Sequence, residues 1–276
     1  MIDLDLFRSR GFTWGIVLLS VATVAMVGAI FTLPQYFQGI TGVNPMGSGV
    51  RLLPMIGGLM LGALPAALLT KRIGPKLVIA LGFAVIGVAC LLGASTTLLT
   101  GTAFTATWMA VLGLGMGLAF APAASAALSQ IDAEHSGVAS GVLQAFTKTG
   151  GPLGAALFGS ALSSVYQAHL PLAGLPAVAA STMRGGLAQG LAVAHALGSA
   201  ALTQGVQSAF VRGMDAALLV SVGIAGVGML LTLAFMPLTT AAGAAVPPDP
   251  GAEVAGSGPT PLATGRIVAA AAEPME

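Results

Sequence analysis

Long, nearly uninterrupted apolar runs recur along this chain, and the polar residues gather in the segments between them. An α-helix needs about 20 predominantly apolar residues to cross the hydrocarbon core of a bilayer. The strands of a membrane β-barrel would show short segments of alternating apolar and polar residues instead. Six runs predict membrane-spanning helices: Phe12–Phe37, Val50–Leu69, Leu77–Ala94, Phe104–Leu128, Val138–Leu162 and Ala216–Met236.

The connections between these runs are short, with one exception, and Gly, Pro and Asn mark them as turns. The stretch 166–215 is longer and Ala-rich, and Arg184 and His195 interrupt it. It is predicted to be a long outside loop with a helix lying on the membrane surface. A seventh span is the alternative, so the pattern leaves open whether Met183–Leu202 lies on the membrane or enters it.

The polar residues at the two ends complete a three-part organisation. Residues 1–11 mix acidic and basic side chains and are predicted to be a cytoplasmic lead-in. A six-helix transmembrane bundle follows over 12–237. The composition then shifts to Ala, Gly and Pro, which predicts a disordered cytoplasmic tail over 238–276.

Composition assigns the apolar runs to a membrane and not to a soluble core. Of the 276 residues, 56% are hydrophobic and only 7% are charged, and the mean hydropathy is +0.94. Soluble domains carry about 25% charged residues, so the lipid bilayer is the expected partner of this surface. The formal net charge of +1 provides no basic face for a nucleic acid, and no nucleic-acid partner is expected.

The distribution of Lys and Arg predicts the orientation, because cytoplasmic segments are enriched in these residues. With a cytoplasmic N-terminus, the inside receives Arg8, Arg10, Lys71, Arg72, Lys76 and Arg266, and the outside receives Arg51, Arg184 and Arg212. The excess on the first side predicts that both termini are cytoplasmic, which an even number of spans also requires.

Four stretches, in this order, carry a resemblance to a known family. They are LFRSRGF at 6–12, LPQYFQGITGVNPMGSGVRLLP at 33–54, GLGMGL at 113–118 and SGVASGVLQAFTKTGGPLGAALFGSAL at 136–162. Together they resemble the C-terminal half of the fourteen-helix drug:proton antiporters of the major facilitator superfamily, over roughly residues 5–240. The resemblance implies an all-α, six-helix bundle that forms one half of a major facilitator fold in the plasma membrane.

The loop after the second predicted span departs from the signature loop of that superfamily, Gly-x-Leu-x-Asp-Arg-x-Gly-Arg-Lys. Here Ala67 replaces the first Gly and Lys71 replaces the Asp, whereas Arg72, Gly74 and Lys76 keep their places. The strong form of the motif belongs to the N-terminal half of such transporters, so this loop resembles a degenerate second copy. Its basic residues set topology, and a role as a gate latch is the alternative.

Lys148 is the most informative charge, because it falls inside a predicted span. It lies 12 residues after Ser136, which at about 1.5 Å per residue is roughly 18 Å into the helix and near the middle of a core about 30 Å thick. A charged residue inside a membrane span is by default a candidate functional residue. The alternative is that Lys148 snorkels to the interface or pairs with another half of the transporter. Related antiporters place a basic residue at the position of Thr147, about 100° away around the helix.

Other polar and small residues in the spans give two further sets. Candidates for the substrate path, beside Lys148, are Gln144, Thr147, Thr149, Gln35 and Gln38. Hydrogen bonds between helices explain these residues almost as well. Candidates for close helix packing are Gly113, Gly115, Gly117, Gly151, Ala155 and Gly159, because small residues let helices approach.

The remaining polar residues indicate neither an enzyme nor a metal site. The single cysteine is within an apolar run, and the histidines show no metal-ligand spacing: Cys90, His135, His169 and His195. No nucleophile motif or phosphate-binding loop is present. Arg51 and Asp215 stand at the outer ends of predicted spans and are interpreted as interfacial anchors.

The predicted function is therefore transport. The resemblance implies half of a proton-coupled efflux permease for small molecules, with the proton gradient as energy source and no cofactor. Such transporters bind substrate between two six-helix halves, so the expected partner is the missing N-terminal half, and the chain alone, as a truncated or split gene product, is expected to be inactive. The alternatives are a non-transporting accessory or scaffold protein, and a half-transporter that acts as a homodimer.

Overall fold

The structure, a computed structural model, describes residues 10–128 and 136–236, and these residues fold into helices without strands. Their bounds are α1 Arg10–Gly39, α2 Pro45–Arg51, α3 Leu53–Ile73, α4 Pro75–Gly93, α5 Thr102–Leu128, α6 Ser136–Ala168, α7 Ala177–Met183, α8 Leu187–Ala196 and α9 Ala200–Phe235. They belong to one unit, which spans Met1–Thr240. The predicted tail over 238–276 and most of the predicted lead-in lie outside the described residues.

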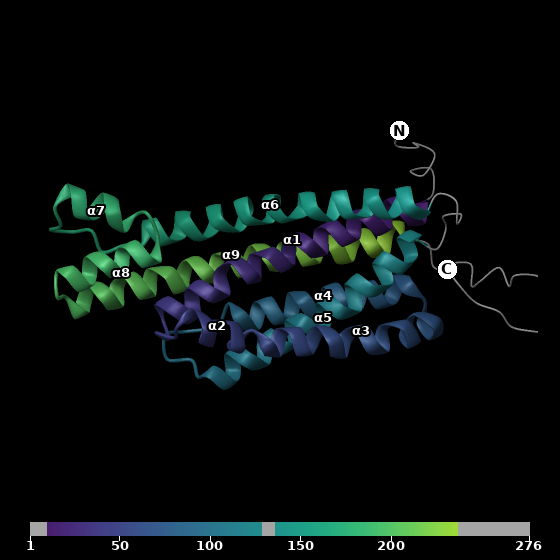
Figure 1. Ribbon diagram of the computed structural model, residues 1–276, viewed down its shortest axis with the longest axis horizontal. Helices are drawn as coiled ribbons and strands as arrows, with labels where there is room; N and C mark the ends of the chain where they lie inside the picture. Colours follow the sequence, from purple (N-terminus) through teal and green to yellow (C-terminus); the bar gives the residue numbers. More distant parts are fainter. Residues whose placement is uncertain (1–9, 129–135, 237–276) are drawn as a thin grey trace, which may run out of the picture. The chain divides into compact units, whose positions relative to one another are not determined.

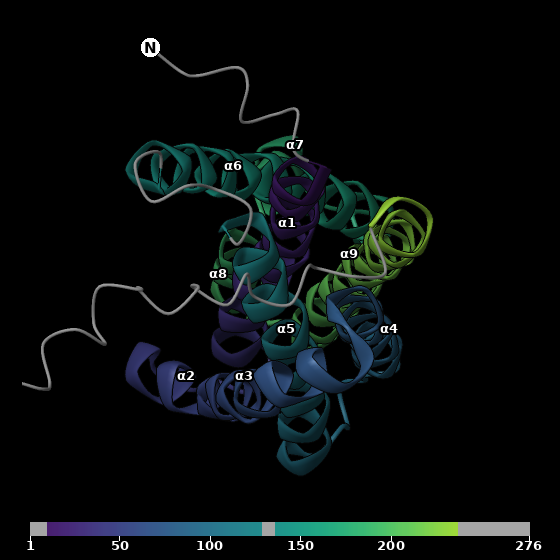
Figure 2. The same cartoon turned by 90° about the vertical axis from the view of Figure 1, so that its right-hand side faces the viewer.

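The long helices run side by side in two groups (Figure 1). In one group α5 packs against α3 and α4, and in the other α1 packs against α6 and α9. Contacts between α4 and α9 and between α1 and α5 join the groups. Figure 2 looks along the helices and shows α5 with α1, α3 and α4 around it. This is the all-α half-bundle that the apolar pattern predicts.

Glycines bring α3 and α5 into backbone contact. A Cβ at Gly58 would collide with the carbonyl oxygen of Ala110, and a Cβ at Gly113 would collide with that of Met55. Gly115 faces the other way, where a Cβ would lie 2.9 Å from the carbonyl oxygen of Gly82 on α4. Close approach between membrane helices depends on such small residues, because packing replaces the hydrophobic effect there.

The small-residue row predicted on α6 is displaced by one position. A Cβ at Gly151 would meet nothing, and one at Gly159 would be 3.8 Å from Phe31, an ordinary contact. The close approach to α1 occurs at Gly154, where a Cβ would lie 3.0 Å from the carbonyl oxygen of Val24. Because one residue is about 100° of rotation, the row that includes Gly151 and Ala155 points away from this contact.

Within the described residues, five helices are long and apolar enough to cross a membrane, and they fall in Gly11–Gly39, Pro45–Ile73, Pro75–Gly93, Thr102–Leu128 and Ala200–Phe235. The remaining predicted span, Val138–Leu162, lies within α6, which has 33 residues and runs beside α1 and α9. Its Gly, Ser, Thr, Gln and Lys residues dilute its apolar content. It is long enough to span, and its packing within the bundle distinguishes it from a surface helix.

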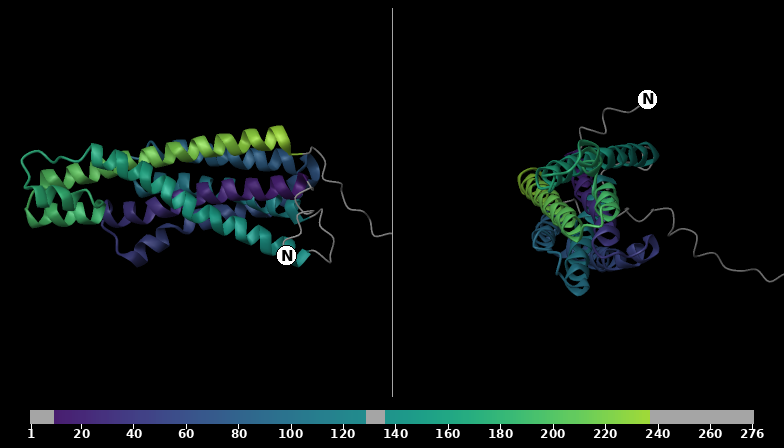
Figure 3. Two further views of the ribbon diagram at one scale, coloured as in Figure 1. Left: turned by 90° about the horizontal axis from the view of Figure 1, so that it is seen from above. Right: turned by 90° about the vertical axis from the view of Figure 1, so that its left-hand side faces the viewer.

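The stretch 166–215 is not a continuous loop. α6 runs to Ala168, and α9 begins at Ala200, 16 residues before the predicted start at Ala216. Between them lie α7 and α8, of 7 and 10 residues, each shorter than the roughly 20 residues that a span needs. In Figures 1 and 3 these two helices lie at the end of the bundle opposite the first residues of α1.

Hydrogen bonds fix this extension to the long helices. The hydroxyl of Tyr166, near the end of α6, donates to the carbonyl oxygen of Met183 at 3.0 Å and lies 3.1 Å from that of Gly186. The side-chain amide of Gln207, in α9, donates to the carbonyl oxygen of Gly39 at 3.1 Å. The first pair of contacts holds the segment of α7 and α8 against the end of α6, the second joins α9 to the end of α1, and α8 also packs against α9 and α1.

The basic loop lies at the opposite end of the bundle. Lys71 and Arg72 occupy the last turn of α3, and Lys76 follows in the first turn of α4. Gly74 joins the two helices with φ of 83°, a left-handed value that glycine adopts without strain. Figure 1 shows this turn at the end where α1 begins and α9 finishes.

Candidate functional site

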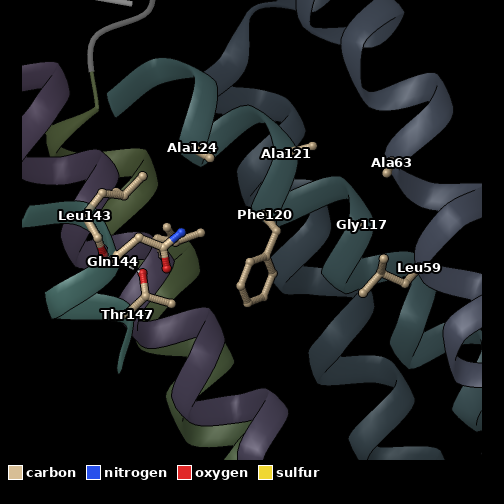
Figure 4. A pocket seen from close by; sticks show the side chains of 10 residues that line it. Leu59, Ala63, Gly117, Phe120, Ala121, Ala124, Leu143, Gln144 and Thr147 are labelled. Carbon is tan, nitrogen blue, oxygen red and sulfur yellow. Dashed lines mark hydrogen bonds between the residues drawn. The ribbon is translucent and has the colours of Figure 1, made fainter. Parts of the chain in front are cut away.

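A cavity of about 390 Å³ opens between four helices of the bundle. Its wall includes Leu19 from α1, Leu59 from α3, Phe120 from α5, and Gln144 and Thr147 from α6. Figure 4 shows the side chains of Gln144 and Thr147 directed across the space towards the ring of Phe120. The remaining lining is small and apolar: Ala63, Gly117, Ala121, Ala124 and Leu143.

Two polar groups interrupt this apolar wall, and they differ in what they offer. The hydroxyl of Thr147 donates to the carbonyl oxygen of Leu143 at 2.8 Å, within its own helix, so it presents mainly its acceptor lone pair and its methyl group. The Gln144 side chain is exposed, and its amide offers both donors and an acceptor. The cavity therefore combines apolar contact area with one amide that can fix an orientation.

Of the substrate-path residues predicted from the sequence, only Gln144 and Thr147 line this cavity. Lys148 and Thr149 are exposed on α6 beside it, and the Thr149 hydroxyl donates to the carbonyl oxygen of Ala145 at 2.8 Å. Lys148 follows Thr147 directly and shares the open side of the bundle without contributing to the wall.

The two predicted residues of α1 lie elsewhere. Gln35 is 16 residues beyond Leu19, the α1 residue of the cavity wall, which corresponds to roughly 24 Å along a helix. Its side-chain amide donates to the carbonyl oxygen of Phe31 at 2.9 Å, and Gln38 is exposed one turn further. Gln35 and Gln38 therefore do not line this cavity, and their place on a substrate path stays a prediction.

Sequence reasoning missed Leu19, Leu59 and Phe120. All three belong to apolar runs in which nothing separates a wall residue from a lipid-facing one. The sequence feature that could have identified Phe120 is an aromatic residue in α5, a helix rich in Gly and Ala. His169 and His195 are exposed, and the described residues hold no group of His, Cys, Asp and Glu that suits a metal.

The apolar surface around the cavity is uncovered. α3 exposes Leu53, Ile56, Met60, Leu61, Leu64 and Leu68, and α6 exposes Phe146, Leu153 and Leu157. Of the apolar helices, α5 is the most buried and the segment of α2 and α3 the least. Long apolar helices with an open, mostly apolar cavity define an integral membrane protein of the polytopic helical class.

Comparison with known proteins places this bundle in a family. The family model described as Major Facilitator Superfamily matches residues 2–155, which is more than half of the chain. The protein therefore belongs to the Major Facilitator Superfamily, a family of transporters and not of enzymes.

Several characterised members are similar to the chain. It is 32% identical over 165 residues to the tetracenomycin C resistance and export protein of Streptomyces glaucescens, covering 59% of this chain and 30% of that protein. It is 29% identical over 164 residues to the multidrug transporter protein MdtP of Bacillus subtilis, with the same coverage. It is 27% identical over 212 residues to the multidrug efflux pump LfrA of Mycolicibacterium smegmatis, covering 76% of this chain and 42% of the pump. The chain thus spans between 30% and 42% of the length of these relatives.

Proposed function

We propose that this chain is the C-terminal half of a drug efflux transporter and forms one wall of its substrate cavity. The observation that carries the proposal is the open cavity at Gln144, Thr147 and Phe120, on a bundle that matches less than half the length of drug export proteins. Major facilitator transporters bind substrate near the midplane between two six-helix halves. A cavity between α1, α3, α5 and α6 has the position that one such half requires.

The partner proposed is the N-terminal half, a second bundle of apolar helices. The exposed leucines of α3 and the exposed Phe146 of α6 flank the cavity, and such a bundle would cover them. A second copy of this chain has the same general chemistry, and a scaffold function needs no cavity at all. These two alternatives are outcomes of the experiment below.

The substrate class follows from the lining. The side chains of the wall are apolar except for Gln144 and Thr147, and within the described residues none of them is charged. A small apolar or amphipathic molecule with at least one polar group suits such a wall. The nearest charge is Lys148, exposed beside the cavity.

The proposed energy source is the proton gradient across the plasma membrane, with both termini in the cytoplasm. The orientation is supported by Lys71, Arg72 and Lys76, which gather at one end of the bundle. The positive-inside rule puts that end in the cytoplasm. Arg51 and Arg184 belong to the opposite end, where α2 and α7 lie.

The experiment uses a host that lacks its own efflux pumps and a dye that such pumps export. Residues 1–276 are expressed alone, and also in a chimera in which they replace the matching segment of the Streptomyces glaucescens relative. The proposal expects dye efflux and its loss with a protonophore from the chimera, and none from the chain alone. Efflux from the chain alone would favour the homodimer, and a well-expressed chimera without efflux would favour the scaffold.

A further inference from the structure

Four buried side-chain polar atoms lack a hydrogen-bond partner in the described residues; one is Oγ of Ser48 in α2, and three others lie on or beside α4, α5 and α9 at the outer end of the bundle. These three are Oγ1 of Thr96, just after α4, Nε1 of Trp108 in α5, and Oδ1 of Asp215 in α9. Thr96 is 2% exposed and Trp108 is 1% exposed. Buried polar groups in proteins are almost always paired, so three unpaired atoms on neighbouring helices call for a ligand or a rearrangement.

The contacts of Gly93 show that Trp108 of α5 and Leu218 of α9 meet near the end of α4. A Cβ at Gly93 would lie 3.1 Å from Leu218 Cδ1 and 3.2 Å from the ring of Trp108. The backbone N–H of Thr96 donates to the carbonyl oxygen of Gly93 at 3.0 Å. Asp215 precedes Leu218 by three residues and shares its face of α9, since residues three apart are neighbours on a helix.

Asp215 is the only acidic residue among the described residues 10–128 and 136–236. It lies 20 residues before Phe235, the last residue of α9, which is about 30 Å along the helix and matches the thickness of the hydrocarbon core. In the proposed orientation Asp215 therefore stands at the outer boundary. An interfacial anchor would direct its whole carboxylate to water, whereas Oδ1 of Asp215 is enclosed.

Trp108 and Thr96 can pair with Asp215 in either protonation state, but the hydrogen bond to Thr96 differs between the two states. An ionised carboxylate only accepts hydrogen bonds, an indole N–H only donates, and a threonine hydroxyl does both. Ionised Asp215 can therefore accept hydrogen bonds from the indole N–H of Trp108 and the hydroxyl of Thr96. Protonated Asp215 still has an acceptor oxygen for the indole N–H and can donate its own O–H to the hydroxyl of Thr96, so the hydrogen bond at Thr96 reverses its direction.

We propose that Asp215, Thr96 and Trp108 form a proton-binding site at the outer end of this bundle. A proton from the outer aqueous phase adds to a carboxylate oxygen of Asp215 and leaves a neutral carboxylic acid, and release to the same or the opposite side restores the charge. The proton removes the negative charge from the site and reverses the hydrogen bond at Thr96. As a step of transport this inference rests on the proposed function, but the site can be measured without transport.

Other charged groups near the site are few. Arg212, one turn earlier on α9, is the charged side chain that acts on Asp215. The other titratable residues on the helices packed against α9 are Lys76 and Cys90 on α4, Lys148 and Tyr166 on α6, Arg10 and Tyr36 on α1, and His195 on α8. The Tyr166 hydroxyl is engaged with Met183, and Cys90 interacts with Ser221.

The first test uses Trp108 as a fluorescent reporter in the full chain, purified in lipid nanodiscs. The chain has two tryptophans, and Trp14→Phe leaves Trp108 alone. Its fluorescence is expected to follow a single titration between about pH 3 and pH 9, a range that covers both exposed and buried carboxyl groups in proteins. Asp215→Asn should abolish that titration, and Asp215→Glu should keep one. The reciprocal variant Trp108→Phe, which leaves Trp14, should show no such change.

The second test needs no substitution and covers the case in which Asp215→Asn fails to fold. A hydrophobic carbodiimide reacts with protonated carboxyl groups, and mass spectrometry of the wild-type chain identifies the labelled residue. Labelling of Asp215 should be lost as the pH rises. A Trp108 titration that survives Asp215→Asn, or an Asp215 that is unlabelled at every pH, would overturn the inference. Since neither measurement involves export, a failure of the efflux experiment stays distinguishable from a failure here.

Discussion

The side-chain amide of Gln207 donates to the backbone carbonyl of Gly39, a contact of 3.1 Å between residues 168 positions apart. Gly39 ends α1, and the last carbonyls of a helix lack partners within it. Gln207 satisfies one of them from the second turn of α9. The contact joins the first long helix to the last at the end of the bundle where α7 and α8 also lie.

Gln207→Ala should therefore destabilise the end of the bundle at which α1 ends and α9 begins. Loss of one hydrogen bond to a helix carbonyl costs about 1 kcal/mol, so the free energy of unfolding in detergent should fall by that amount. Gln204→Ala is the matched control, because Gln204 is exposed one turn earlier on α9. Chemical denaturation followed by circular dichroism measures both variants. Equal stability of the two would contradict a role for this hydrogen bond.

Gly58→Ala should destabilise the contact between α3 and α5 much more than Gly57→Ala does. A Cβ at Gly58 collides with the carbonyl oxygen of Ala110, whereas a Cβ at Gly57 meets nothing within 4 Å. Overpacking a tight contact costs roughly 1–3 kcal/mol, while Ala in place of Gly at an open helical position stabilises slightly. Thermal unfolding in the same detergent gives the comparison. A transition temperature for Gly58→Ala as high as that for Gly57→Ala would mean that α3 and α5 are further apart than described.

The apolar pattern predicted the helical fold well, because a run long enough to cross a bilayer leaves few other structures. It placed the start of α9 at Ala216 instead of Ala200, since Gln204, Gln207 and Arg212 interrupt the apolar run without breaking the helix. Hydropathy measures the preference for lipid and not the preference for a helix. Polar residues that extend a helix beyond the membrane are therefore assigned to a loop.

The candidate site was predicted only in part. Gln144 and Thr147 are polar residues inside an apolar helix, and their polarity identified them as candidates for the substrate path. Leu19 and Phe120 carry no such mark, because which side of an apolar helix faces a cavity depends on its neighbours. For the same reason the small residues of α6 that pack against α1 were predicted at Gly151 and Ala155, one position after Gly150 and Gly154, which make the close contacts. A shift of one residue is invisible in composition, yet it turns the helix by about 100°.

Cysteine labelling should place the α3–α4 turn in the cytoplasm and the α4–α5 connection outside. In a Cys90→Ala background, Leu99→Cys should react with an impermeant maleimide in intact cells, because Leu99 is 96% exposed and lies beyond the far end of α4. Arg72→Cys, exposed at the end of α3, should react only after the membrane is permeabilised. The reverse pattern would invert the orientation deduced from Lys and Arg.

The last prediction concerns Lys148, which is exposed on α6 although it lies deep within the helix. It is 12 residues from the start of α6, roughly 18 Å, so its ammonium group cannot easily reach the inner interface. A charge near the middle of a membrane helix costs about 2.5–3.5 kcal/mol even by insertion scales. Facing an aqueous space between two halves would remove most of this cost, and Lys148, although not part of the cavity wall, directly follows Thr147, which is.

In the chimera with the Streptomyces glaucescens relative, Lys148→Met should therefore lower dye export while leaving membrane abundance unchanged. A hydrogen bond to a charged group is worth about 1.5–3 kcal/mol, which corresponds to roughly tenfold or more in substrate affinity. Lys148→Arg should keep part of the export, since the charge remains while its shape changes. Thr149→Ala is the matched control, because the Thr149 hydroxyl bonds within α6 and lies off the cavity wall. Normal export by Lys148→Met would mean that the lysine snorkels to an interface and does not face the substrate path.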